Sequence, residues 1–247
     1  MLIKIRAVAL RTVPHNDKAS ILTVWSAEKG RLALLLSAGN TAESRRRRAL
    51  TMPMSLFEGV VNLRHDSNIN RLHEIKAWSP DGFSADVSFH PIRSTVALFL
   101  SEVLNVVTRE EDADPALWKL ITETVPVIAR GDSGVLANLP VSFLVRVAQV
   151  LGIAPDMERV KKGLYFDMVE GVFRNTLPTH NFALSAAETK LMLLMAHASH
   201  GYDKLGHIKL NRKERALFLE KAIQYFTLHH YPVNKLKSLE ILRTVFD

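Results

Sequence analysis

The stretch "SILTVWSAEKGRLALLL" (20–36) places two runs of β-branched and apolar residues on either side of the polar turn "SAEKG". Short apolar runs bounded by turn residues are typical of β-strands, so strands are predicted at 20–25 and 31–36. Upstream, "IKIRA" (3–7) alternates apolar with basic residues, which is the pattern of a half-buried strand. Three strands are therefore expected before residue 40.

Two more strands are predicted in "MSLFEGVVNLR" (54–64) and "INRLHEIKAW" (69–78), with "HDSN" as the turn between them. Gly59 suits a β-bulge or a tight corner in the first of these strands. Five short strands within about 75 residues fit a small barrel.

After "SPDG" (79–82) the apolar period changes from two to three or four residues, which indicates helices. The stripe that predicts the first helix consists of Phe89, Ile92, Val96, Phe99, Val103 and Val107. Further helices are expected at 115–129 and 140–152, each opening on a proline, with Gly152 as a left-handed cap. Two more are expected after the capping box "SAAE" (185–188) and at roughly 212–230.

One segment of the helical part has the sequence pattern of strands instead of helices. "GLYFDMVEGVFRN" (163–175) predicts two short strands around "VEG". The fold class expected is therefore α+β, with an N-terminal barrel followed by a mainly helical domain that carries a small hairpin projection.

Composition excludes several classes of protein. The 247 residues include 47% apolar residues, enough for a buried core, and no cysteine. The missing cysteine removes disulfides, thiolate zinc sites, iron–sulfur clusters and cysteine nucleophiles. No run approaches the roughly 18–20 apolar residues of a membrane span, and "MLIKIRAVALRT" carries charges where a signal peptide is apolar. A cytoplasmic protein without membrane association is expected.

The net charge of +7 is distributed unevenly. Residues 1–80 contain 13 Lys and Arg against 6 Asp and Glu, residues 81–160 contain 6 against 11, and residues 161–247 contain 13 against 8. A basic first third suggests an anionic partner, for which nucleic acid is the commonest candidate.

Enzyme signatures are missing from the sequence. It contains no phosphate-binding or dinucleotide-binding glycine motif, no H-E-x-x-H and no G-x-S-x-G, so no cofactor and no catalytic residue is expected. The acidic group "REEDAD" (109–114) can bind a divalent cation through Glu110, Glu111, Asp112 and Asp114, but acidic residues before a helix explain it more simply. Likewise, a zinc site from His197, His200, His207 and Asp203 competes with helix-end histidines that contact carbonyl groups.

The basic residues of the first third predict a phosphate-binding face. Four consecutive arginines, Arg45, Arg46, Arg47 and Arg48, lie between the third and fourth predicted strands. Near the ends of the strands lie four more cations: Arg11, Lys18, Lys29 and Arg31. Guanidinium and ammonium groups spaced along a backbone suit phosphates. Only Trp25, Phe57 and Trp78 supply aromatic rings, so binding is expected to be mostly electrostatic and weakly selective for sequence.

Several segments, in this order, resemble the bacterial RecO family of recombination mediators. They are "AVALRTVPHNDKASILTVWSAEKGRLALLLSAG" (7–39), "SRRRRALTMPMSLFEGVV" (44–61), "VAQVLGIAPD" (147–156), "YFDMVEGVF" (165–173) and "LKSLEILRTVF" (236–246). The resemblance implies an OB-fold over residues 1–80 and a helical domain over 81–247, with a hairpin-like insertion at about 157–176.

The same resemblance implies a non-enzymatic role in DNA repair and recombination, at the nucleoid. Family members bind single- and double-stranded DNA, anneal complementary strands, and work with RecR to load RecA onto strands coated by single-strand-binding protein. Their helical domain receives the acidic, hydrophobic C-terminal tail of that protein. Apolar helix faces beside Arg130 or Arg146 are the type of site that such a tail requires.

One feature departs from the family. Many members carry a four-cysteine zinc motif where this chain has "MERVKKGLYFDMVEGVFRN" (157–175), so no metal is expected here. Packing of Leu164, Phe166, Val169 and Phe173 is expected to hold the projection instead, and Lys161 and Lys162 are either a second phosphate contact or solubilising lysines.

Two other functions compete with the mediator hypothesis. The first is an interaction scaffold whose basic barrel binds an acidic protein surface. The second is a phosphate-transforming enzyme that uses the acidic group at 109–114. Strand annealing on bare oligonucleotides separates the mediator from the scaffold.

Overall fold

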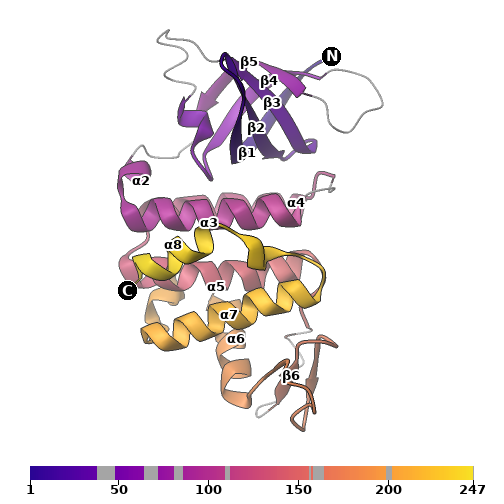
Figure 1. Ribbon diagram of the computed structural model, residues 1–247, viewed down its shortest axis with the longest axis vertical. Coiled ribbons are helices and arrows are strands. Elements are labelled where there is room, and N and C mark those ends of the chain that lie inside the picture. Colours follow the sequence, from indigo (N-terminus) through magenta and orange to yellow (C-terminus); the bar gives the residue numbers. More distant parts are fainter. Residues whose placement is uncertain are drawn as a thin grey trace. The chain divides into compact units, whose positions relative to one another are not determined.

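The computed structural model describes residues 1–37, 48–63, 72–80, 86–108, 112–155, 157, 164–198 and 202–246. They form two compact units, which divide between Ala129 and Arg130. The first unit contains the strands β1–β5 and helices α2–α4, and the second contains helices α5–α8 and a small sheet (Figure 1).

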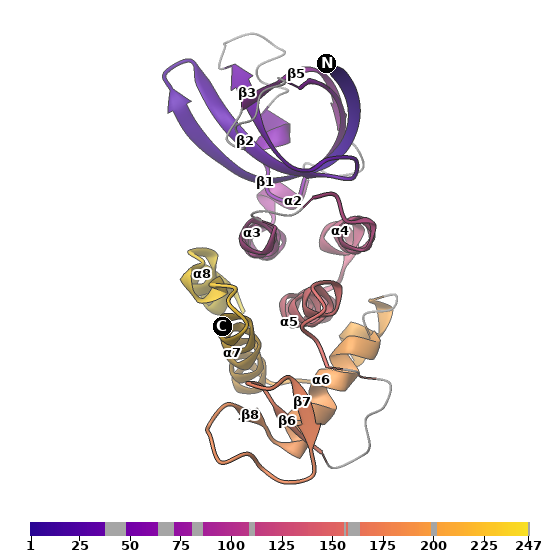
Figure 2. The same ribbon diagram turned by 90° about the vertical axis from the view of Figure 1, so that its right-hand side faces the viewer.

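Five strands form a closed barrel in the first unit. They are β1 (Leu2–Asn16), β2 (Ala19–Ser26), β3 (Gly30–Ser37), β4 (Leu56–Asn62) and β5 (Leu72–Pro80). Their order around the barrel is β1-β2-β3-β5-β4, and β4 closes it by pairing with β1. All pairs are antiparallel except β3 with β5. Figure 2 shows these strands curving around a closed ring. The OB-fold prediction is confirmed.

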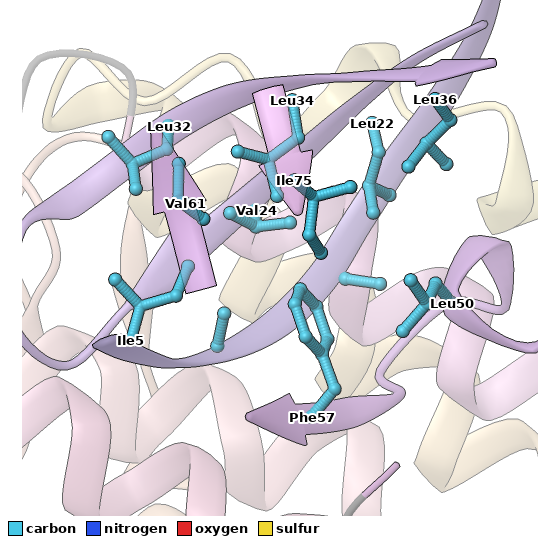
Figure 3. Packing of buried hydrophobic residues seen from close by; sticks show 12 residues of the cluster. Ile5, Leu22, Val24, Leu32, Leu34, Leu36, Leu50, Phe57, Val61 and Ile75 are labelled. Carbon is cyan, nitrogen blue, oxygen red and sulfur yellow. The ribbon is translucent and has the colours of Figure 1, made fainter. Parts of the chain in front are cut away.

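The barrel core is purely apolar and follows the alternation of the strands. Ile5, Leu22, Val24, Leu32 and Leu34 point to the inside, where they meet side chains from the two strands that close the barrel (Figure 3). Leu50, from the short 3-10 helix η1 (Arg48–Thr51), is 1% exposed and belongs to the same cluster. The residues that alternate with this set therefore face outward; Arg11 among them is exposed, whereas Val8 and Trp25 are buried.

Strand β1 pairs with two other strands. Its residues 2–8 pair with β4 and its residues 7–16 pair with β2. The β1–β2 register shifts between Ala9 and Arg11 and again between Pro14 and Asn16. Such bulges bend a strand and increase its twist, which a long strand shared by two sides of a barrel requires. On β4 the register with β5 shifts between Val60 and Val61, directly after Gly59.

Three helices follow the barrel in the first unit: α2 (Asp86–Phe89), α3 (Pro91–Val107) and α4 (Pro115–Arg130). Pro91 occupies the first turn of α3, and Nδ1 of His90 accepts from the N–H of Arg93 at 3.4 Å. The expectation that Phe89 belongs to the buried stripe is wrong, because its side chain is 87% exposed. It ends α2, and the chain leaves helical geometry at His90 before α3 begins.

Among its described residues, the second unit contains four helices and two short 3-10 helices. They are α5 (Ser133–Val150), α6 (Ala186–Ala198), η3 (Asp203–His207), α7 (Arg212–Leu228), η4 (Val233–Lys235) and α8 (Ser238–Val245). The capping box before α6 is confirmed: Ser185 donates its N–H to Glu188 Oε2 at 2.7 Å, and Glu188 returns its N–H to Ser185 Oγ at 3.2 Å.

Helix α5 begins earlier than the sequence predicts. Its N-cap is Asp132, whose Oδ1 accepts from the N–H of Val135 at 2.8 Å, and Pro140 lies inside the helix. The side chain of Asp132 satisfies a free N–H of the first turn, and the burial of Val135, Leu136 and Leu139 offsets the backbone hydrogen bond that Pro140 cannot donate. The end of the helix matches the prediction, with Gly152 at a φ of +69°.

Helix α5 is the one described helix long and apolar enough to cross a membrane by those two criteria. Within its 18 residues, 67% are buried inside the protein. Burial of that extent is what a core helix shows, so length and composition are weak grounds for a membrane span here.

The small sheet has three strands in the order β7-β6-β8: β6 (Tyr165–Asp167), β7 (Val172–Arg174) and β8 (Ala183–Leu184). The predicted pair of strands around "VEG" is confirmed as β6 and β7, which are antiparallel. The third strand was not predicted. Its two residues are too short for a periodic pattern and become a strand only by pairing with Phe166 and Asp167.

Candidate nucleic-acid interface

Arg11 lies on the outer face of the barrel, directly after the bulge in β1. It pairs with Thr23 of β2, which pairs with Ala33 of β3, so these three residues form one outward row. The Arg11 side chain is exposed and makes no ion pair with a described residue. The small neighbours in its row leave its guanidinium accessible to a ligand that crosses the sheet.

Lys18 lies in the turn that joins β1 to β2. Its backbone N–H donates to Oδ1 of Asn16 at 2.9 Å, which orders the turn, while its side chain is exposed. The neighbouring Ala19 pairs with Ser37. The chain therefore leaves β3 beside Lys18, at the point where the segment that carries the arginine run begins.

Three members of the predicted run, Arg45, Arg46 and Arg47, lie outside the described residues, and the side chain of Arg48 is not described either. The segment that follows the run is fixed against β1. The N–H of Met54 donates to the carbonyl of Ala9 at 2.9 Å, and the N–H of Ala9 donates to the carbonyl of Ser55 at the same distance. Both flanks of the run therefore meet the part of the β1–β2–β3 sheet that carries Arg11 and Lys18.

Lys29 and Arg31 lie at the other end of β2. Lys18 precedes this eight-residue strand and Lys29 follows it, which separates the two lysines by roughly 26 Å. Lys29 is exposed, and its backbone N–H donates to Ser26 Oγ at 3.0 Å. The predicted cations thus lie at both ends of β2 and beside its middle, and they do not gather in a single cluster.

Arg31 differs from the other predicted cations because its guanidinium is bound to α3. Its Nη1 donates to the carbonyl of Asn105 at 3.2 Å and its Nη2 donates to Oδ1 of the same residue at 2.8 Å. Thr108, the C-cap of α3, lies 3.5 Å from Nη1. A cation at a helix C-terminus is favoured by the free carbonyl groups there, so Arg31 joins β3 to this helix.

The aromatic residues of the barrel contribute little to its outer face. Trp25 and Phe57 are 0% and 1% exposed, and Trp78 packs against the core cluster. The outer row next to Arg11 consists of Val13, Ile21 and Leu35, all half-buried. Among the described residues this face therefore offers cations and aliphatic side chains, without a platform for base stacking.

Other cations of the barrel were not singled out by the sequence. Lys4 is exposed on the outer side of β1, in the part of the strand that pairs with β4. Arg6 is engaged: its Nε donates to Glu28 Oε1 at 2.9 Å, and its guanidinium lies 5.9 Å from the ring of Trp118. The alternation in "IKIRA" that predicted the strand also placed Lys4 on the outside, so this residue was within reach of sequence analysis.

The predicted partner-binding arginines of the helical part line neither of the two apolar pockets described below. Arg130 is exposed at the last residue of α4. Arg146 donates from Nη1 to the hydroxyl of Tyr202 at 2.7 Å, and its guanidinium lies 5.1 Å from that ring. These contacts hold the segment before η3 against α5.

A pocket with the expected chemistry lies elsewhere in the second unit, between α5, α7 and α8. Its volume is about 220 Å³. The apolar lining comes from Ala137, Pro140, Val141, Ala216, Leu219, Leu242 and Phe246. Arg212, Arg215 and Arg243 complete it, and none of the described residues that line it is acidic. We call this the arginine pocket; it pairs apolar surface with three cations.

One sequence feature could have indicated this pocket, namely the basic residues at the start of α7. Arg212, Lys213 and Arg215 occupy the first turn of α7, where the helix dipole disfavours cations. The capping box of Asn211 and Glu214 offsets part of that cost. Arg215 donates from Nη1 to the carbonyl of Leu210 at 2.6 Å, which leaves its other N–H groups for a ligand.

A second cavity, of about 40 Å³, lies between α5, α6, α7 and the small sheet. Lys221 is the one charged residue in its described lining, and its Nζ donates to the carbonyl of Ala183 at 3.4 Å. Burial raises the pKa of Tyr225 to about 12, so its hydroxyl stays protonated and donates to the carbonyl of Ile153. This cavity is part of the packing that holds the small sheet on the helices.

A four-cysteine zinc site does not fit the residues present. The chain has no cysteine, and no group of three or more metal-ligating side chains occurs among the described residues. In its place, the carboxylate of Asp167 joins three segments. Its Oδ2 accepts from Arg174 Nε at 2.7 Å, and its Oδ1 lies 3.3 Å from His180 Nε2 and accepts the N–H groups of Val169 and Glu170 at 3.1 Å.

Several forces act on the ionisation of Asp167. Burial raises its pKa, but the hydrogen bonds from Glu170, Arg174 and Val169 and the charge of His180 lower it, and the net result is a pKa below the ordinary value. Phe166 is 1% exposed and supports the sheet as expected, whereas Val169 is 42% exposed. The expectation that Val169 packs inside the projection is therefore wrong, because its side chain faces solvent from the turn between β6 and β7.

The acidic group and the histidines mostly have structural contacts. Asp114 caps α4, accepting from the N–H groups of Ala116 at 2.7 Å and Leu117 at 3.2 Å. Nδ1 of His197 lies 2.7 Å from the carbonyl of Leu193, the helix-end contact that the sequence offered as an alternative to a metal site. Glu110, His200, Lys161 and Lys162 lie outside the described residues.

Comparisons with known proteins agree with this architecture. The family model "Recombination protein O N terminal" matches residues 1–80, and "Recombination protein O C terminal" matches residues 89–240. Proteins named DNA repair protein RecO from Azobacteroides pseudotrichonymphae and Phocaeicola vulgatus are 27% and 28% identical over 247 residues, covering all of both chains. One from Bacteroides fragilis is 27% identical over 248 residues, again with full coverage.

Proposed function

Because the chain belongs to the RecO family of DNA repair proteins, we propose that it acts as a recombination mediator. In this role it binds single- and double-stranded DNA, anneals complementary strands, and with RecR helps load RecA onto strands coated by single-strand-binding protein. Holding and exchanging strands breaks no covalent bond, so the role needs no catalytic residue and no cofactor. The protein would work in the cytoplasm, on the nucleoid.

The outer face of the β1–β2–β3 sheet is the DNA-binding surface in this proposal. The observation that carries it is the exposure of three cations around β2, namely Lys18 before the strand, Arg11 beside its Thr23 and Lys29 after it, while Trp25 of the same strand is buried. Exposed cations attract the phosphate backbone and give little readout of bases. The run Arg45–Arg48 would add contacts at the end of the sheet that carries Arg11 and Lys18.

We assign Arg31 to the fold and not to this surface. Its guanidinium donates to both oxygens of Asn105, so a phosphate would compete with contacts already made. Binding through the remaining cations is tested by titrating a fluorescein-labelled single strand with the full chain at several salt concentrations. A steep linear fall of log K with log salt is expected, and a flat response would rule out the electrostatic surface.

The arginine pocket is the site proposed for the acidic, hydrophobic tail of single-strand-binding protein. Three guanidinium groups suit carboxylates, and the apolar lining from α5 and α7 suits a large apolar side chain. Arg130 and Arg146, the alternatives from sequence, lack this combination, since Arg146 is bound to Tyr202. We place the tail at Arg212, Arg215 and Arg243.

An interaction scaffold remains the competing function. In that case the cations of the barrel bind an acidic protein surface, and DNA binding is incidental. Annealing of bare complementary oligonucleotides separates the two functions, because a scaffold gives no acceleration over the spontaneous rate, whereas a mediator that neutralises phosphates on both strands does.

A further inference from the structure

One segment of the second unit is strongly basic. The residues "KLGHIKLNRK" (204–213), which lead from η3 into the first turn of α7, include Lys204, Lys209, Arg212 and Lys213 and no acidic residue. The acidic residue that follows them, Glu214, is engaged in the cap of α7, where its Oε2 accepts from the N–H of residue 211 at 2.8 Å. Four positive charges therefore lie close together in the chain without an acidic residue among them.

The backbone of this segment is fixed from one side. The side chain of Asn138, on α5, donates from Nδ2 to the carbonyls of Leu205 and Ile208, both at 2.9 Å. Asn138 is 2% exposed and Leu205 is 0% exposed. Lys204 and Lys209, by contrast, are exposed. The segment is thus held on α5 through its buried residues, while its lysines reach into solvent from an ordered backbone.

The fold makes little use of these lysines. Lys204 and Lys213 make no ion pair with another described residue. The Nζ of Lys209 lies 3.4 Å from the carbonyl of Gly206, which is a long contact. Lys213 is exposed in the first turn of α7, where the helix dipole disfavours a cation. Stability therefore does not explain the three lysines, whereas an anionic ligand would.

The lysines adjoin the arginine pocket along the chain. Arg212 lines that pocket and directly precedes Lys213, but none of the three lysines lines it. A protein whose tail binds in the arginine pocket therefore comes close to the lysines. In the proposed function that protein coats a single strand of DNA, whose phosphates suit the compact charge of an ammonium group.

We propose that Lys204, Lys209 and Lys213 form a second DNA-binding surface, here called the lysine surface, on the second unit. This inference rests on the proposed function and specifies its ligand: the phosphate backbone of the second strand in annealing. Two strands are polyanions that repel each other, so cations are needed on both. With a surface on each unit, one chain can hold both strands, and the arginine pocket stays available for the tail.

The test counts the strands that one chain binds. A fluorescein-labelled strand of about ten thymidine nucleotides, within the site size of one OB-fold, is titrated with the full chain at low salt until binding saturates. The original chain should bind two strands. The triple variant Lys204→Gln, Lys209→Gln, Lys213→Gln should bind one, and it should lose the acceleration of annealing on bare complementary strands because it holds only one of them.

The control removes the same charge from the same unit. Lys190, Lys235 and Lys237 are exposed lysines outside the lysine surface. Replacing all three by glutamine should leave the number of bound strands and the annealing rate unchanged. An equal loss in this control would show that only net charge matters, which would overturn the lysine surface.

Thermal unfolding by circular dichroism separates a role in binding from a role in the fold. The lysine-surface variant should unfold at the temperature of the original chain or above it, because Lys213 opposes the helix dipole. A lower unfolding temperature would show that these lysines serve the fold, and the lysine surface would be overturned.

Failure of this inference differs from failure of the proposed function. If the original chain binds no strand and accelerates no annealing, the mediator function itself is wrong. If the original chain binds only one strand, the lysine surface is overturned and the mediator function stands. The same conclusion follows if the triple variant anneals bare strands as fast as the original chain while Arg11→Ala with Lys18→Ala is impaired.

Discussion

Arg31 of β3 donates from Nη2 to Oδ1 of Asn105 at 2.8 Å, and from Nη1 to the carbonyl of the same residue at 3.2 Å. One residue of α3 thereby receives both hydrogen bonds through its side chain and its main chain. The contact separates Arg31 from the exposed cations on the same sheet, although the sequence grouped them together.

Replacing Arg31 by alanine is therefore expected to affect stability more than DNA binding. Asn105 loses two charge-assisted hydrogen bonds, which should lower the free energy of unfolding by about 1–3 kcal/mol. Urea unfolding followed by circular dichroism measures this loss. The salt slope of single-strand binding should stay unchanged at temperatures where the variant is folded, and a slope reduced without loss of stability would move Arg31 to the DNA-binding surface.

Removing the exposed cations should instead affect DNA binding more than stability. The double variant Arg11→Ala with Lys18→Ala should keep its stability and lower the salt slope for single strands by about 0.7 for each lost contact. Anisotropy titrations between low and physiological salt give this slope.

A matched control for that experiment is Lys76→Ala. Lys76 is also an exposed cation of the barrel, but its Nζ is already paired with Glu74 Oε1 at 2.7 Å. The Lys76→Ala variant should leave the salt slope unchanged.

Replacing Arg45–Arg48 by alanine should lower the salt slope further than the double variant does. An unaltered slope in that variant would show that the run is only a solvated loop.

The two sites differ in how much of them could be predicted from the sequence. Alternation along "IKIRA" and the turns around β2 predicted the strands and placed Lys18 and Lys29 at their ends, because these signals are local. The partner of Arg31 is 74 residues away, on α3. No periodic pattern reports such a contact, so its structural role was out of reach.

In the helical unit, too, contacts between distant residues could not be predicted from the sequence. Pro140 resembled a helix start, yet the cap at Asp132 began α5 earlier and the proline was tolerated inside. The arginine pocket combines the start of α7 with residues near the end of the chain, which only the packing of three helices brings together. Asp167 likewise gained its role from contacts with Arg174 and His180, which no sequence motif indicated.

The carboxylate of Asp167 should make the stability of the small sheet depend on pH. Its pKa is lowered in the folded protein, so its stabilisation is fully present above the unfolded value of about 3.9 and is lost as the pH falls through the folded value. The free energy of unfolding should therefore fall when the pH is taken from 5 to below about 3.

Asp167→Asn tests that assignment. The variant loses the charge that pairs with Arg174 and should be less stable at pH 7 by roughly 1–3 kcal/mol, with a smaller further loss on acidification. Glu58→Gln, at an exposed carboxylate on β4, should behave as the original chain does. Equal acid sensitivity in all three proteins would show that Asp167 does not control the transition.

The arginines of the pocket should contribute to binding of the tail peptide, whereas their basic neighbour Lys213 should not. Arg215→Gln and Arg243→Gln each remove a cation that lines the pocket, and each should weaken binding of the acidic tail peptide by about tenfold, since one charge-assisted hydrogen bond contributes about 1.5 kcal/mol. Lys213→Gln removes a cation from the same turn of α7 that does not line the pocket. If all three weaken binding equally, the peptide responds to net charge and not to the pocket.

Annealing of complementary strands coated by the cognate single-strand-binding protein tests the mediator function most directly, because it requires both surfaces at once. The original chain should accelerate annealing on bare and coated strands. Arg11→Ala with Lys18→Ala should lose activity on both, and Arg215→Gln with Arg243→Gln should lose it on coated strands alone. Full activity of the first variant on bare strands, or of the second on coated strands, would contradict the account.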